Sequence, residues 1–161
     1  MENKPLEISQ EEQEKADKKN NEATEITAEW ESKTGKNPFH LTGMVLAYIG
    51  DAVYELEIRN LLIARGYFRG NRLHKEATRR VNAPTQSRLV LSMLDSLEPD
   101  ELEIFKRGRN TKPKYIPKQS NVTEYTNSSG LEALMGYWYL QGNTGRIRET
   151  IERLEEMLAE K

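Results

Sequence analysis

The stretch that decides the fold runs Ala47-Tyr48-Ile49-Gly50-Asp51-Ala52-Val53-Tyr54-Glu55-Leu56-Glu57-Ile58-Arg59. It has no proline, and its apolar residues recur at spacings of three and four, which predicts a helix. The apolar positions on this helix fall into two stripes: Ile49, Val53, Leu56 and Ile63 in one, and Met44, Tyr48, Ile58 and Leu62 in the other. A helix that is apolar on two sides is expected to lie at the centre of a domain and to be mostly covered.

Two carboxylates, Asp51 and Glu55, fall inside the second stripe. A carboxylate among apolar neighbours is costly unless a cation pairs with it or it binds a metal. Asp51 therefore either pairs with Arg59 or another cation, or serves as a metal ligand. Glu55 is four residues from both Asp51 and Arg59, so it either shares the site of Asp51 or, as we favour, forms an ordinary helix ion pair with Arg59.

The composition bounds the class of protein. The chain has 161 residues, enough for one domain with a hydrophobic core, and it has no cysteine, which excludes disulfides and thiolate metal sites. No apolar run is long enough to span a membrane, and the polar N-terminus is unlike a signal peptide. We therefore expect a soluble cytoplasmic protein.

The charge is distributed unevenly along the chain. Residues 1–35 contain ten Asp and Glu residues and five Lys, and we expect them to form a disordered acidic tail in front of a domain at 36–161. The net charge is −5 in this tail and −2 in the whole chain, which leaves +3 on the domain. A mildly basic domain suits a polyanionic partner.

The rest of the domain follows the same helical periodicity, and no alternating strand pattern occurs. Helices are predicted at 42–64, 71–81, 83–97, 98–107, 122–140 and 146–160, and Gly66 is expected to end the first. Residues 108–121 contain Pro113, Pro117 and many basic residues, which predicts an exposed, mobile loop. The expected fold is all-α, with about six to seven helices.

A second informative stretch runs Thr126-Asn127-Ser128-Ser129-Gly130-Leu131-Glu132-Ala133-Leu134-Met135-Gly136. Ser129 and Glu132 have the spacing of a capping box, which favours a structural role for Glu132. However, Gly50 and Gly136 are both expected inside helices, where glycine costs about 0.5–1 kcal/mol relative to alanine. Close approach of two helix backbones would compensate for that cost. If the helices cross at these glycines, Asp51 and Glu132 come together and form an oxygen-only site for Mg²⁺ or Mn²⁺.

Cations gather in two places. The segment 106–118 contains six basic residues and no acid, and a second set lies on the predicted helix at 71–81. Contact with phosphates would explain such a cluster, and a solvated surface is the alternative for the second set. The sequence has no zinc-binding spacing and no glycine-rich phosphate loop. The candidate phosphate contacts are His74, Lys75, Arg79, Lys106, Arg107, Arg109, Lys112, Lys114 and Lys118.

These motifs together resemble the ribonuclease III family. The segment 47–53 resembles its signature around an essential aspartate, and 131–136 resembles its second motif, whose glutamate binds metal. The chain is most similar to the Mini-III branch, compact bacterial enzymes without a double-stranded-RNA-binding domain. Three shorter matches support this branch: Leu73-His74-Lys75, Arg107 to Asn110 and Tyr125 to Ser128. The resemblance covers residues 38–158.

The resemblance implies a two-fold dimer of an endonuclease domain that hydrolyses double-stranded RNA and leaves 5′-phosphate ends. It implies that Asp51 and Glu132 are the catalytic and metal-binding carboxylates, with Mg²⁺ as the cofactor and Mn²⁺ able to substitute. Mini-III enzymes mature precursor 23S ribosomal RNA, which makes that RNA the implied substrate, with a ribosomal protein as a possible helper. The number of metal ions stays open.

The chain also departs from the wider family. Positions where ribonuclease III carries further acids hold Met44, Ala47 and Ser129 here. This thinned set motivates an alternative, a catalytically silent module that binds structured RNA or a ribosomal particle. A third alternative is an all-α interaction domain without an RNA role.

Overall fold

The computed structural model describes residues 29–111 and 121–160, together with 9–11, 13–15, 18, Tyr115 and Lys118. In this part of the chain every regular element is a helix, which confirms the all-α prediction. Residues 29–34 are also helical. The remaining elements are η1 (Pro38–His40), α2 (Gly43–Ala64), α3 (Gly70–Val81), α4 (Ala83–Met93), η2 (Leu94–Ser96), α5 (Pro99–Arg109), α6 (Val122–Leu140) and α7 (Thr144–Ala159).

Local sequence signals set the ends of α2. The side chain of Thr42 accepts a hydrogen bond from the backbone N–H of Val45 at 3.3 Å, which caps the first turn. At the other end Gly66 has a φ of +81°, and the N–H of Tyr67 returns to the carbonyl of Leu62 at 3.1 Å. This left-handed glycine ends the helix, as the sequence predicts.

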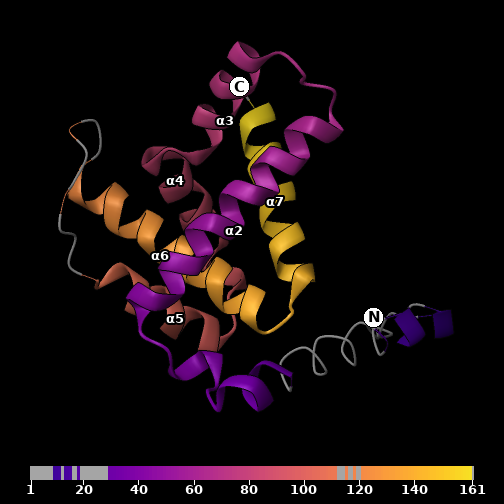
Figure 1. The fold of residues 1–161 in the computed structure, drawn as a ribbon, viewed down its shortest axis with the longest axis vertical. Helices are drawn as coiled ribbons and strands as arrows, with labels where there is room; N and C mark the ends of the chain where they lie inside the picture. The colour runs from indigo at the N-terminus through magenta and orange to yellow at the C-terminus, as the bar shows by residue number, and fades with distance from the viewer. Residues whose placement is uncertain are drawn as a thin grey trace, which may run out of the picture.

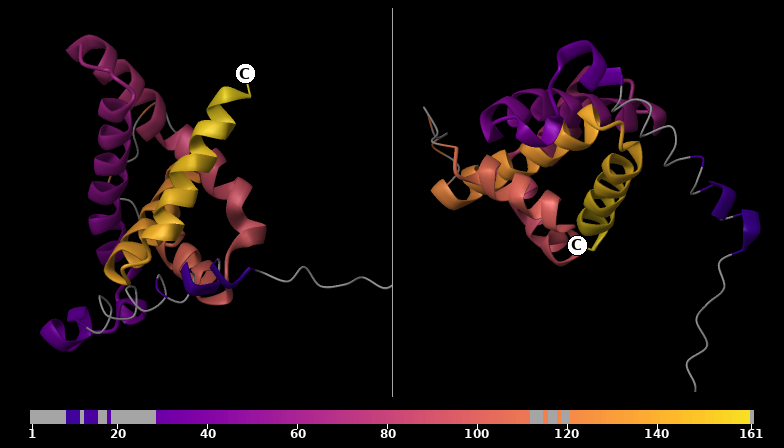
Figure 2. Two further views of the ribbon diagram at one scale, coloured as in Figure 1. Left: turned by 90° about the vertical axis from the view of Figure 1, so that its right-hand side faces the viewer. Right: turned by 90° about the horizontal axis from the view of Figure 1, so that it is seen from below.

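The centre of the domain is α6, which packs against α2, α4 and α5, and α7 closes the remaining side (Figure 1). Figure 2 shows the same arrangement from two further directions, with α2 and α7 on either side of the core. Leu131, Leu134 and Trp138 of α6 are fully buried, as their spacing predicts. The predicted inner face of α7 is also buried, and it consists of Ile147, Ile151, Leu154 and Leu158.

The expectation that α2 is covered on both sides is wrong. One face is buried and includes Leu46, Tyr54, Ile58 and Leu62. α6, α3 and α5 pack against α2, yet much of its remaining apolar surface lies open. The exposed apolar side chains of α2 include Met44, Tyr48, Leu56 and Ile63, with Tyr48 84% exposed.

Two predicted boundaries also shift. The helix predicted at 83–97 divides into α4 and the 3-10 turn η2. α5 continues to Arg109 instead of ending before Gly108. Gly108 lies inside α5 because it faces α6, where a Cβ atom would come within 2.5 Å of the Cβ atom of Ala133.

The N-terminal segment reaches the domain before residue 36. Trp30, in the helical segment 29–34, is partly buried and packs against the hydrophobic core. The division into a tail at 1–35 and a domain at 36–161 stays a prediction. Within the described residues, none of the helices has both the length and the apolar character that crossing a membrane requires.

Candidate active site

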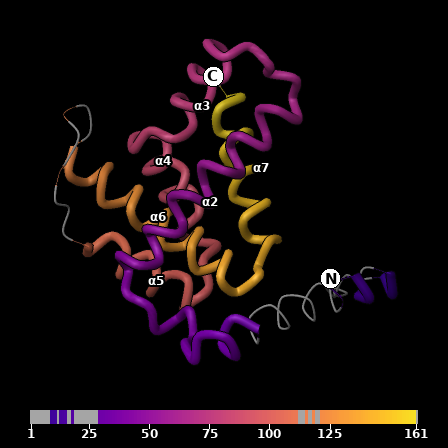
Figure 3. The backbone as a smooth tube through the Cα atoms, viewed as in Figure 1, coloured from indigo at the N-terminus to yellow at the C-terminus, as the bar shows by residue number. Residues whose placement is uncertain are grey.

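α2 and α6 touch at their glycines, where the tube trace shows one helix crossing the other (Figure 3). A Cβ atom on Gly50 would overlap the carbonyl oxygen of Glu132, and one on Gly136 would overlap the carbonyl oxygen of Leu46. The two backbones can therefore approach this closely only because both positions lack a side chain. The crossing that the sequence predicts is present.

The crossing brings three carboxylates into one electrostatic environment. Burial raises the pKa of Glu132 to about 8, and the charges of Asp51 and Glu55 add to the shift. Burial also raises the pKa of Asp51, with Glu55 contributing. Asp51 is solvent-exposed, whereas Glu132 is mostly covered, so the cluster opens to solvent on the Asp51 side. Such a set of mutually repelling acids is stabilised by a bound cation.

The prediction that Ser129 and Glu132 form a capping box is wrong. α6 begins at Val122, so that Ser129 and Glu132 lie well inside the helix. The capping box of α6 consists instead of Asn121 and Glu124: the Asn121 side chain accepts from the N–H of Glu124 at 2.8 Å, and the Glu124 carboxylate accepts from the N–H of Asn121 at 3.3 Å. Glu132 is therefore free of a capping role.

The ion pairs near Asp51 test the alternative that this carboxylate simply pairs with Arg59 or another cation. Arg59 pairs with Glu55 at 2.9 Å, which confirms the favoured role of Glu55, and not with Asp51. Among the ion pairs between described residues, none involves Asp51 or Glu132. Glu55 nevertheless raises the pKa of both of these acids, so it also lies close to the cluster. Its spacing of four from Asp51 is the sequence signal for this proximity.

The donor set fits a hard divalent cation. Carboxylate oxygens are the protein ligands that Mg²⁺ and Mn²⁺ prefer, and Mg²⁺ usually keeps several waters. Within the described ranges, no three His, Asp or Glu side chains are grouped closely enough to hold an ion by themselves. Asp51 and Glu132 would therefore supply part of the coordination and leave positions for water and phosphate oxygens.

The predicted phosphate contacts lie in different settings. His74, Lys75 and Arg79 are exposed on α3, and His74 lines a cavity of about 160 Å³ that Glu55 also borders. Lys106 and Arg109 are exposed at the end of α5, and Lys118 is exposed beyond it. Lys112 and Lys114 lie outside the described residues.

Arg107 differs from these cations because it has internal partners. Its guanidinium donates to the carbonyls of Phe39 at 2.7 Å and Leu41 at 3.2 Å, and it lies 4.6 Å from the centre of the Phe39 ring. Arg107 therefore braces the turn before α2 against α5. Its predicted contact with phosphate stays a prediction, but this structural role was missed from the sequence.

We expect the stability of the metal-free protein to depend on Glu132. Its pKa of about 8 exceeds the ordinary value of 4.5, so the folded state favours the protonated form. The protonated carboxyl of Glu132 therefore stabilises the folded state. This contribution is fully present below the ordinary pKa and is lost as the pH rises through 8. In EDTA at pH 9, Glu132→Gln should therefore raise the free energy of unfolding by on the order of 3 kcal/mol, and the gain should disappear near pH 4.

Urea denaturation at both pH values measures this difference. Glu152→Gln, at an exposed position on α7, is the matched control and should change little. An equal effect of Glu132→Gln at the two pH values would contradict the expectation.

The chain is similar to known proteins in both sequence and fold. The Ribonuclease III domain family matches residues 44–143, a range that contains Asp51, Glu132 and both glycines. Mini-ribonuclease 3 from Symbiobacterium thermophilum is 39% identical over 122 residues, covering 76% of this chain and 94% of that protein. Mini-ribonuclease 3 from Streptococcus pneumoniae is 42% identical over 121 residues, covering 74% and 89%. The crystal structure of a Fusobacterium nucleatum protein matches with a TM-score of 0.65 and 33% identity, covering 69% of this chain and 90% of that one.

Proposed function

Because the chain belongs to the ribonuclease III family, and within it to the Mini-ribonuclease 3 branch, we propose that it is an endoribonuclease that hydrolyses double-stranded RNA and leaves 5′-phosphate and 3′-hydroxyl ends. The observation that carries the proposal is the joining of Asp51 and Glu132 at the contact between α2 and α6. Mg²⁺, or Mn²⁺ in its place, is the proposed cofactor. We propose the ends of precursor 23S ribosomal RNA as the substrate, a ribosomal protein as a helper, and the cytoplasm as the location.

The chain's own groups have limited but definite tasks in this mechanism. When bound, the ion would activate water and neutralise charge on the phosphate. Asp51 and Glu132 would hold it, and because burial raises the pKa of Glu132 to about 8, this carboxyl would give up its proton on binding. Ion binding is thus coupled to proton release and should strengthen as the pH rises toward 8. The covered side of the crossing keeps solvent from Glu132, while the exposed Asp51 faces the RNA.

Incubation with a long RNA duplex tests the function directly. We expect cleavage in Mg²⁺, none in EDTA, and products that a 5′-phosphate-dependent exonuclease degrades. Cleavage that persists in EDTA would overturn the metal mechanism. Binding of the duplex without cleavage would favour the catalytically silent alternative, and failure to bind at low salt would favour an interaction domain.

The open face of α2 supports the proposal of a homodimer. Exposed apolar patches on soluble proteins mark interaction sites. Along this face, Tyr48 lies eight residues before Leu56, and Ile63 lies seven residues after it. An apolar cavity of about 290 Å³ borders Ile63, and its lining consists of Arg59, Leu62, Ile63, Leu73, His74 and Ala77. A two-fold axis at Leu56 would therefore place Tyr48 of one subunit against this cavity on the partner subunit.

We expect Tyr48→Glu to convert the dimer to a monomer, because a charged group would have to be buried in the interface. Light scattering after size-exclusion chromatography measures the mass. Leu91→Glu is the control, since Leu91 is also a half-exposed apolar residue but lies on α4. A dimer that survives Tyr48→Glu unchanged would place the interface elsewhere.

The basic segment beyond α5 should set the salt dependence of RNA binding. Each lost phosphate contact reduces the slope of log affinity against log salt by roughly 0.9. Replacing Lys112, Lys114 and Lys118 by glutamine should therefore weaken binding and lower the slope by about 2–3. The control replaces Lys15, Lys18 and Lys19 in the N-terminal segment, with the same loss of charge. An unchanged slope would remove Lys112, Lys114 and Lys118 from the RNA path.

A further inference from the structure

α3 is attached to the domain mainly by charged groups. Its only buried residue is Arg80, which is 3% exposed. The apolar residues of the helix, Leu73, Ala77 and Val81, are only partly buried against the core. A helix with so little apolar anchoring depends on polar contacts for its exact position.

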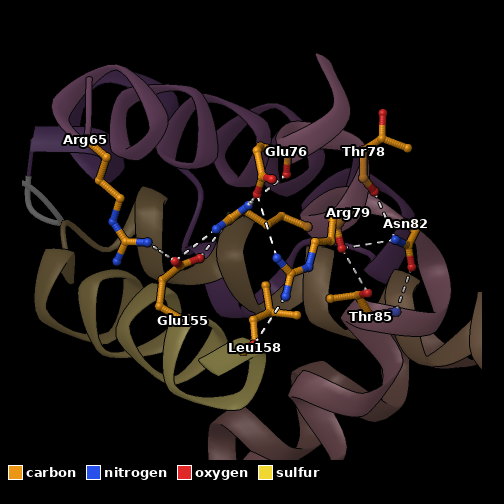
Figure 4. Close-up of polar contacts among 9 residues, drawn as sticks. Arg65, Glu76, Thr78, Arg79, Asn82, Thr85, Glu155 and Leu158 are labelled. Atoms are coloured by element: carbon orange, nitrogen blue, oxygen red, sulfur yellow. Dashed lines mark hydrogen bonds and ion pairs between the residues drawn. The ribbon is translucent and has the colours of Figure 1, made fainter. Parts of the chain in front are cut away.

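Arg80 makes these contacts in two directions, toward Glu155 and toward Glu76, both of which are labelled in Figure 4. Toward α7, its Nε donates to Oε1 of Glu155 at 2.7 Å and its Nη2 donates to Oε2 at 3.1 Å. Toward its own helix, its Nη1 donates to the carboxylate of Glu76 at 2.6 Å and to the Glu76 carbonyl at 3.0 Å. The planar guanidinium thus holds α3 and α7 in one relative orientation. Arg65, at the C-cap of α2, completes the network by pairing with Glu155.

The backbone of Arg80 is also tied to the helix that carries Asp51. The hydroxyl of Tyr54 donates to the Arg80 carbonyl at 2.8 Å, and this bond is buried. Tyr54 is fully buried and lies three residues after Asp51. Asn82 adds a link at the end of α3, where its side chain donates to the carbonyls of Thr78 and Arg79 and accepts from the N–H of Thr85. Arg80 is therefore held from both its side chain and its backbone.

The position of α3 matters because of what its other face carries. His74 and Lys75 are exposed there, and His74 shares the 160 Å³ cavity with Glu55. Arg79 is instead turned toward α7, where it donates to the Leu158 carbonyl at 3.2 Å (Figure 4). A tilt of α3 would thus change the distance between His74 or Lys75 and the carboxylates at the crossing. RNA duplexes are recognised largely through phosphates at fixed spacings.

We propose that Arg80 is a positioning residue for RNA, which holds His74 and Lys75 at the distance from Asp51 where they meet phosphates beside the one that is cut. This inference rests on the proposed function. Arg80 itself is buried and touches no RNA. Its effect must therefore pass through these exposed side chains of α3.

A double-mutant cycle isolates this effect. Duplex affinity is measured in an Asp51→Asn background, so that the RNA stays intact, and kcat and KM are measured with Asp51 in place. Arg80→Met should weaken binding roughly tenfold and raise KM while kcat changes little. When His74 and Lys75 have already been replaced by glutamine, the same Arg80→Met substitution should change the affinity less than about twofold.

Arg65→Met is the matched control, because Arg65 contacts the same Glu155 but lies at the C-cap of α2 and is half exposed. It should leave KM near the wild-type value. If Arg80→Met does not fold, as judged by circular dichroism, Glu155→Gln replaces it in the cycle, since it breaks the same link from the α7 side.

Equal effects of Arg80→Met with and without His74 and Lys75 would overturn the inference, and so would an unchanged KM. These results are distinguishable from failure of the proposed function. In that case the unmodified protein would neither bind nor cut the duplex.

Discussion

The Asp51→Asn protein is expected to cut duplex RNA in Mg²⁺ at least about a thousandfold more slowly than the unmodified protein. Asparagine keeps the size of the side chain but removes the negative charge that a divalent ion needs. Asp51 is the exposed carboxylate of the cluster, so its loss creates no cavity. Single-turnover cleavage rates at saturating protein measure the effect without a contribution from binding.

The fold of this variant should survive. Replacing Asp51 relieves its repulsion with Glu55 and Glu132, so the melting temperature in EDTA should stay equal or rise slightly. Asp95→Asn, at an exposed position in η2, provides the control and should cut RNA normally. Normal turnover by the Asp51→Asn protein would refute the assignment of the site.

The largest effect on stability is expected for Gly50→Ala. The added methyl group would overlap the carbonyl of Glu132, so α2 and α6 would have to separate at the centre of the domain. Overpacking of a rigid contact costs typically 1–3 kcal/mol and occasionally more, and here the obstacle is backbone that cannot change its rotamer. We expect a loss of at least about 3 kcal/mol in the free energy of unfolding, together with loss of cleavage.

Gly70→Ala is the matched control for this prediction. Gly70 also lies in a helix, but a Cβ atom there would have no neighbour within 4 Å. Alanine should therefore be neutral or stabilise by about 0.5–1 kcal/mol. Urea denaturation of both variants separates the two cases, and similar stabilities would show that the crossing tolerates a side chain.

Much of the fold is readable from local signals. α6 has the predicted ends, and the spacing of Leu131, Leu134 and Trp138 marks its buried face. The crossing at Gly50 and Gly136 was predictable because glycine inside a helix needs a compensating contact. These inferences hold because they depend on spacing and on the cost of a residue type, both of which the sequence states directly.

The errors have physical causes as well. Apolar periodicity shows which positions avoid water, but it does not show whether the chain itself covers them, so the open face of α2 was missed. The pattern at Ser129 and Glu132 is local, and it occurs inside a helix as readily as at its start. Arg80 was overlooked because its charge suggested a surface position, although its spacing of seven from Leu73 and three from Ala77 places it on the inner face.

The contact of α2 with α6 has a consequence for protein design. At this contact main chain of one helix faces main chain of the other, and the two acids belong to residues that make it or adjoin it: Glu132 supplies a contacting carbonyl, and Asp51 follows Gly50. The relative positions of Asp51 and Glu132 therefore depend on backbone geometry, which varies less than side-chain packing does. If Asp51 and Glu132 bind a cation as proposed, transplanting the two glycines and two acids onto another pair of crossing helices should transfer the proposed cation site.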